Sequence, residues 1–134
     1  NRFGVIVLAL ALAGCGGGSS TPTTTLNLTG NYSGSIQDST VGAGSVSFAL
    51  TQSGSSLTGT WQTTYLNPSN SNSGTLTGSV SSSGGISATL APSVPGTCPF
   101  AVTASTTTGA TITGTYAAVQ CSITDAGSIN VTKQ

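Results

Sequence analysis

The chain has 134 residues with no net charge, because only two are Lys or Arg and only two are acidic. So low a charge density excludes the basic surface of a nucleic-acid-binding protein and a polybasic membrane-binding patch. His and Glu are absent from the sequence, so a His-based catalytic triad is impossible. We therefore expect neither an enzyme nor a cofactor-binding protein.

The N-terminal segment is apolar from residue 3 to residue 13, and Arg2 precedes it. This run is too short for a transmembrane helix, whereas a basic residue, a short apolar stretch and small residues are typical of a signal peptide. The sequence Leu-Ala-Gly-Cys at 12–15 closely resembles the lipobox of bacterial lipoproteins. The resemblance implies that Cys15 carries diacylglycerol and a further acyl chain such as palmitate. The alternative is a buried strand or helix that happens to end in Gly-Cys.

The same resemblance predicts the location of the protein. Residues 1–14 would form a helical signal peptide that is cleaved, and residues 15–26 would be the lipidated Cys and a flexible Gly/Ser/Thr linker. Gly16, rather than Asp, follows the Cys, which in Gram-negative lipoproteins favours the outer membrane. We therefore expect a lipid-anchored envelope protein on the periplasmic face or the cell surface.

Residues 27–134 are predicted to form one all-β domain. Apolar residues alternate with Ser, Thr, Asn or Gln, and turn residues interrupt the pattern at short intervals. One apolar and one polar face predict antiparallel strands. We expect eight strands, which contain residues 28–36, 46–50, 57–63, 76–80, 86–90, 100–104, 112–118 and 129–131.

A Thr-Gly-x-aromatic repeat ends at Tyr32, Trp61 and Tyr116, with a degenerate copy at Val80. A mid-strand glycine permits a sharp bend or a ring lying over it, and a small closed barrel needs both. We therefore expect an eight-stranded antiparallel up-and-down barrel in which the last strand pairs with the first. A two-sheet β-sandwich is the alternative.

The strand rhythm over residues 27–134 resembles that of calycin barrels, the avidin-like and lipocalin-like proteins. The resemblance implies the architecture only. Avidin-like proteins place several tryptophans around biotin, whereas this chain has only Trp61. The lipocalin Gly-x-Trp lies on the first strand, and here it lies on the third predicted strand.

Turn residues predict the register of three hairpins. Loops at 53–54, 82–84 and 108–110 would set these pairs opposite each other: Leu50 with Leu57, Phe48 with Gly59, Val46 with Trp61, Val80 with Ile86, Leu76 with Leu90, and Val102 with Tyr116.

The cysteines predict a disulfide. If Cys15 is lipidated, Cys98 and Cys121 remain, and an oxidising compartment favours their pairing over free thiols. Two cysteines without His or Glu make a poor metal site. The register around the 108–110 loop leaves the two cysteines one position out of step, so we expect a bulge or a frayed strand end near Pro99.

Two sets of residues are candidates for a site. The aromatic residues would either fill the barrel or line a cavity for a small apolar ligand; they are Tyr32, Phe48, Trp61, Phe100 and Tyr116. Asp38 and Asp125 fall in predicted loops. They would make a paired-carboxylate site only if those loops met, which we do not expect.

These observations favour a monomeric, non-enzymatic envelope protein whose barrel is a structural or interaction module for an envelope partner. A carrier of a small apolar ligand is the alternative. A periplasmic protease inhibitor is a third hypothesis, against which the acylation of the N-terminal arm argues, because such inhibitors insert a free arm.

Overall fold

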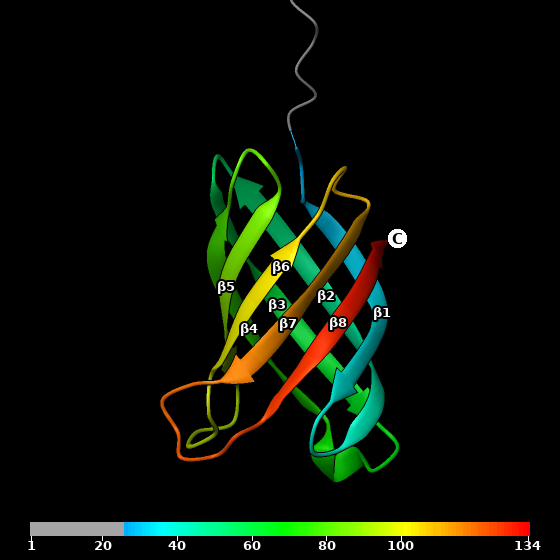
Figure 1. The fold of residues 1–134 in the computed structure, drawn as a ribbon, viewed down its shortest axis with the longest axis vertical. Coiled ribbons are helices and arrows are strands. Elements are labelled where there is room, and N and C mark those ends of the chain that lie inside the picture. Colours follow the sequence, from blue (N-terminus) through cyan, green and yellow to red (C-terminus); the bar gives the residue numbers. More distant parts are fainter. Residues whose placement is uncertain (1–25) are drawn as a thin grey trace, which may run out of the picture.

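The computed structural model describes residues 26–134, which form a closed antiparallel β-barrel (Figure 1). Each strand pairs with the next along the chain, and β8 pairs with β1. The predicted eight-stranded up-and-down barrel is therefore confirmed, and the sandwich is excluded. The signal peptide, the lipidation site at Cys15 and all of the linker except Leu26 lie outside the described residues.

The elements are β1 Gly30–Asp38, β2 Gly42–Ser53, β3 Ser56–Tyr65, a 3₁₀ helix η1 Pro68–Asn70, β4 Asn72–Val80, β5 Gly85–Pro92, β6 Phe100–Ser105, β7 Thr111–Ala118 and β8 Ala126–Lys133.

The alternating pattern determines which side chains face the interior. In β2, Val46, Phe48 and Leu50 are buried, whereas the intervening Ser47 and Ala49 are exposed. The other strands follow the same rule, so the hydrophobic core lies inside the barrel and most Ser and Thr side chains lie outside, with Thr63 and Thr106 as buried exceptions. Burial of each large apolar side chain stabilises the fold by roughly 1.5–3 kcal/mol.

Two of the repeat's strands show why glycine is needed. A Cβ added to Gly59 would lie 2.0 Å from the carbonyl oxygen of Ala49 on β2. A Cβ at Gly34, on β1, would lie 2.0 Å from the carbonyl oxygen of Asn130 on β8. Glycine therefore lets neighbouring backbones approach more closely than any side chain would allow.

The predicted hairpin registers are correct around the 82–84 and 108–110 loops. The prediction for the 53–54 loop is wrong by two residues: Leu50 pairs with Gly59, not with Leu57, and the loop is Gly54-Ser55. Gly54 has φ +60° and supplies the left-handed conformation that a tight hairpin requires. A shift of two residues keeps every side chain on its face, so alternation alone does not reveal it. The remaining predicted partners in this hairpin shift likewise, so that Phe48 faces Trp61 and Val46 faces Thr63.

The two ends of the barrel differ (Figure 1). The end from which the N-terminal segment emerges, here called the closed end, is formed by the short β2–β3, β4–β5 and β6–β7 connections. Leu28 is completely buried there, and the Tyr32 hydroxyl donates a hydrogen bond of 2.6 Å to the Gly109 carbonyl. The opposite, open end carries the β1–β2 loop and the longer β3–β4, β5–β6 and β7–β8 loops. Within residues 26–134, no helix is long and apolar enough to cross a bilayer.

Candidate ligand-binding site

An apolar cavity of about 210 Å³ enters the barrel from the open end. Beyond it, the space left in the closed half of the core is only about 20 Å³. The interior is therefore filled in one half and hollow in the other. The cavity wall combines aliphatic side chains with four of the five aromatic residues predicted for the interior, which are Phe48, Trp61, Phe100 and Tyr116.

The aromatic wall is ordered by edge-to-face packing. Phe100 lies between Trp61 and Tyr116, with ring centroids 6.5 Å and 5.6 Å apart and interplanar angles of 86° and 87°. Trp61 Nε1 donates to the Thr75 carbonyl at 3.1 Å, which fixes the indole ring and uses its polar atom. The edge-to-face arrangement of Phe100 with Trp61 and with Tyr116 is one of the geometries that aromatic pairs prefer.

Tyr32 takes the core-filling role that the prediction allowed, and Tyr65 was not among the predicted residues. Tyr32 lies in the closed half, where its hydroxyl binds Gly109, and it does not line the cavity. Tyr65 does line the cavity mouth, although the sequence analysis did not select it. The signal was present, because Tyr65 lies in β3 at the same alternation as Trp61 and Thr63, both buried.

The two carboxylates meet at the cavity mouth. Asp38 ends β1, and Asp125 immediately precedes β8. Their side chains are hydrogen-bonded to each other, and the Tyr116 hydroxyl donates to Asp38 Oδ2 at 2.5 Å. Thr40 Oγ1 donates to Asp125 Oδ1 at 3.2 Å. The expectation that the two loops stay apart is therefore wrong. Because β8 pairs with β1, Asp38 lies opposite Gly127, two residues from Asp125.

The pair has two different protonation equilibria. Burial raises the pKa of Asp38, but hydrogen bonds from Tyr116 and from the backbone N–H groups of Val41 and Thr40 outweigh it and hold the pKa below its ordinary value. Burial and the adjacent charge of Asp38 raise the pKa of Asp125. As the pH rises, Asp38 therefore loses its proton before Asp125 does.

The tyrosine hydroxyls at the mouth are neutral partners of this pair. Burial, followed by the hydrogen bond to Asp38, raises the pKa of Tyr116. Burial also raises the pKa of Tyr65. Both hydroxyls therefore stay protonated at physiological pH.

The Lys133 side chain lies at the other end of the barrel from the two carboxyl groups. Within residues 26–134, Lys133 is the one cationic side chain. Its Nζ donates to the Asn27 carbonyl at 3.1 Å and lies 5.7 Å from the centroid of the Tyr32 ring, in the closed half. The same residues contain no group of three or more side chains suited to hold a metal ion. The carboxylate pair therefore has only hydroxyl and backbone partners within the described barrel.

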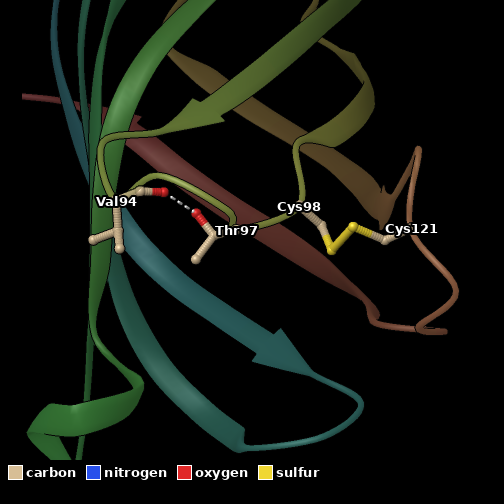
Figure 2. Close-up of a disulfide and its surroundings, with 4 residues drawn as sticks. All are labelled: Val94, Thr97, Cys98 and Cys121. Atoms are coloured by element: carbon tan, nitrogen blue, oxygen red, sulfur yellow. Dashed lines mark hydrogen bonds between the residues drawn. A yellow bond between two sulfur atoms is a disulfide. The ribbon is translucent and has the colours of Figure 1, made fainter.

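The predicted disulfide between Cys98 and Cys121 is confirmed, with a Cα–Cα distance of 5.9 Å. Figure 2 shows that it ties the loop before β6 to the loop after β7. The β6–β7 pairing extends to Pro99, whose carbonyl accepts from the Val119 N–H at 2.9 Å, so the one-residue offset comes after Pro99 and Val119, where Gln120 has a left-handed φ of +61°. Thr97 also donates to the Val94 carbonyl at 2.6 Å within its loop (Figure 2). Two of the four open-end loops are thus joined covalently.

The loops of the open end carry exposed apolar side chains. Among the described residues, the exposed large hydrophobic side chains are confined to the four loops of this end, with one on each loop. We call them the rim residues: Val41, Leu66, Val94 and Ile123.

No protein-family model matches the chain, and no curated protein matches it. Among solved structures, a redesigned β-barrel is similar, with a TM-score of 0.63 and 11% sequence identity over 80% of this chain and 91% of that chain. At this identity the likeness concerns the fold alone.

Proposed function

We propose that the barrel is a carrier of a small apolar ligand, bound in the open-end cavity. The observation that supports this function is an apolar cavity of about 210 Å³ in a barrel whose other half is packed. Protein cores contain few voids larger than a water molecule, whereas ligand sites are concave and apolar with a few polar groups. The cavity has the volume of about seven liquid waters at about 30 Å³ each. A ligand with the size of a substituted benzene fits this volume.

Trp61 fluorescence tests this proposal, because Trp61 lines the cavity and is the single tryptophan of the chain. Titration with 2-phenylethanol should change the emission and saturate. Val46→Phe adds a ring inside the cavity and should abolish the response, whereas Ser47→Phe adds the same ring to the exposed outer wall and should not. Equal binding by the two variants, or no binding by the unmodified protein, would refute the carrier function.

The proposal includes attachment to the bacterial envelope. The lipobox resemblance at 12–15 supports removal of residues 1–14 and lipidation of Cys15, with the outer membrane as destination. Mass spectrometry of the membrane fraction should find a diacylglyceryl group on the mature N-terminal Cys. Cys15→Ser should lose the modification and the membrane association. A membrane-bound Cys15→Ser protein would contradict the anchor.

We further propose that the carrier is not an enzyme. The residue types of the chain support this, since it lacks His and Glu, and its two acidic groups are hydrogen-bonded to each other at the cavity mouth. The discriminating observation is hydrolytic turnover. Activity that disappears in Asp38→Asn or Asp125→Asn would contradict a non-enzymatic role.

A second candidate function, an interaction module for an envelope partner, is favoured by the four rim residues. These four are the exposed large apolar side chains of the described residues, and all lie at one end of the barrel, where a partner could cover them. Replacing Leu66, Val94 and Ile123, the three rim residues that do not line the cavity, by Ser should abolish co-purification with a cross-linked envelope partner while leaving 2-phenylethanol binding intact. Unchanged partner recovery would exclude the rim as the contact surface.

A further inference from the structure

We propose that the ligand is a small amine whose apolar body occupies the aromatic cavity and whose ammonium group binds the Asp38–Asp125 pair at the mouth. This inference rests on the proposed carrier function and adds the chemical class of the ligand's head group.

The first argument is the charge balance of the site. Carboxylates that are fully buried are normally paired with a cation or a metal, and a ligand seated in the cavity would bury Asp38 and Asp125 further than their present intermediate exposure. Here the pair contacts hydroxyl groups, backbone N–H groups and the other carboxyl group. Within residues 26–134 the cationic side chain is Lys133, which is bound at the closed end. A ligand that supplies a positive charge would complete the site.

The second argument is the position of the pair relative to the cavity. Asp38 and Asp125 line the same cavity as the aromatic wall, at the end where it opens to solvent. A ligand with an apolar body and a polar end would therefore place that end beside the carboxylates. Tyr65 and Tyr116 also line the mouth, and aromatic ring faces attract cations. An anionic end would be repelled by Asp38, which ionises readily.

The third argument concerns pH. The titratable groups that face the pair are Tyr116 from β7 and Tyr65 from β3, and both stay neutral at physiological pH. Charge at the mouth is therefore governed by the two carboxyl groups. Amine binding should weaken as the pH falls through their pKa values, because protonation removes the attraction while the apolar cavity is unchanged.

The experiment uses three probes that share a phenyl body: 2-phenylethylamine as the cation, 2-phenylethanol as the neutral compound and phenylacetate as the anion. Each is titrated into the purified protein at pH 7 with Trp61 fluorescence as the readout. A charge-assisted hydrogen bond should make the amine bind at least about tenfold more tightly than the alcohol. Phenylacetate should bind more weakly than the alcohol, and added salt should reduce the preference for the amine.

Charge-removing variants locate the effect. Asn keeps a side-chain oxygen that accepts from Tyr116 at position 38 and from Thr40 at position 125. Asp38→Asn combined with Asp125→Asn should reduce amine affinity to the alcohol affinity measured for the same variant. Lys133→Gln removes a charge from the closed end and should leave the preference intact. If the double variant fails to fold, Asp38→Asn alone must lower the preference.

The outcomes separate this inference from the carrier function. If the three probes bind equally to the unmodified protein, the carrier function stands and the amine proposal is overturned. If calcium chloride displaces the amine at an ionic strength at which sodium chloride does not, the pair is a metal site, and the amine proposal is likewise overturned. If no probe binds, the carrier function itself fails.

Discussion

The two carboxyl groups have opposite effects on stability at neutral pH. The folded-state pKa of Asp38 lies below that of the unfolded chain, so its contribution is present above the unfolded value of about 3.9 and is lost as the pH falls through the folded value. The pKa of Asp125 is raised, so its contribution is present below the unfolded value and is lost as the pH rises through the folded one.

We therefore predict that Asp38→Asn lowers the free energy of unfolding at pH 7 and that Asp125→Asn raises it. An amide at position 125 would still donate to Asp38 without adding a second negative charge. Both changes should stay below about 1 kcal/mol, because the groups are partly exposed and screened by solvent. Urea unfolding at pH 7 and pH 3 measures them. Changes of the same sign at pH 7 would contradict the assignment of the lower pKa to Asp38.

Gly59 supports a second prediction at this scale. A Cβ in Gly59→Ala would lie 2.0 Å from the Ala49 carbonyl oxygen, so the β2 and β3 backbones would have to separate. We expect a loss of about 1–3 kcal/mol in urea unfolding. Gly85→Ala is the matched control, because its Cβ would meet only the Ser81 hydroxyl, at 3.1 Å. Equal losses for the two variants would refute a special role for Gly59.

At the scale of strands and loops, the alternation of apolar and polar residues predicts which face of each strand is buried, but it does not determine the register between strands. It places the buried faces of the eight strands, because a half-buried strand has period two. It does not distinguish registers that differ by two residues, which is why the Gly54-Ser55 loop was misplaced. There, Gln52 also binds the preceding segment, accepting from the Leu28 N–H at 2.8 Å and donating to the Leu26 carbonyl at 3.2 Å. The alternation of residues around Gln52 does not predict these hydrogen bonds.

The candidate site was only partly predictable for a related reason. The aromatic wall follows from strand phase, but cavity volume depends on how the rings pack, and composition does not specify packing. The Asp38–Asp125 contact joins residues far apart in sequence. It follows from two predicted features taken together: β8 pairs with β1 in an antiparallel manner, and Asp38 follows the first predicted strand whereas Asp125 precedes the last, so both lie at the same end of the barrel.

The disulfide acts at the level of loops. It closes a segment with a sequence separation of 23 between Cys98 and Cys121. By constraining the unfolded chain, it should stabilise the barrel by about 3 kcal/mol. We predict that Cys98→Ala combined with Cys121→Ala lowers the free energy of unfolding by this amount in urea. The unmodified protein in reductant should behave alike. A loss below about 1 kcal/mol would show that the open-end loops are held by other contacts.

For the whole molecule, the important feature is the asymmetry of its ends. The closed end combines tight hairpins, the buried Leu28 and the chain's emergence toward the N-terminus. The open end combines the cavity, the carboxylates, the disulfide and the apolar rim. Under the proposed lipid anchor at Cys15, the membrane would hold the chain from the side of the closed end, which would leave the open end free to receive a ligand. Stability and binding should therefore depend on opposite halves of the same barrel.

Because one half of the barrel is packed and the other is hollow, we predict that the same Val→Phe substitution lowers the free energy of unfolding in the closed half but not in the open half. Val80→Phe adds a ring to the packed closed half, where Val80 is only 4% exposed, and should cost about 1–3 kcal/mol by overpacking. Val46→Phe adds the ring where Val46 faces the cavity, so the free energy of unfolding should stay within about 1 kcal/mol of the unmodified protein. Urea unfolding of both variants, followed by Trp61 fluorescence and by circular dichroism, makes the comparison. A loss for Val46→Phe equal to that of Val80→Phe would mean that the open half is as tightly packed as the closed half.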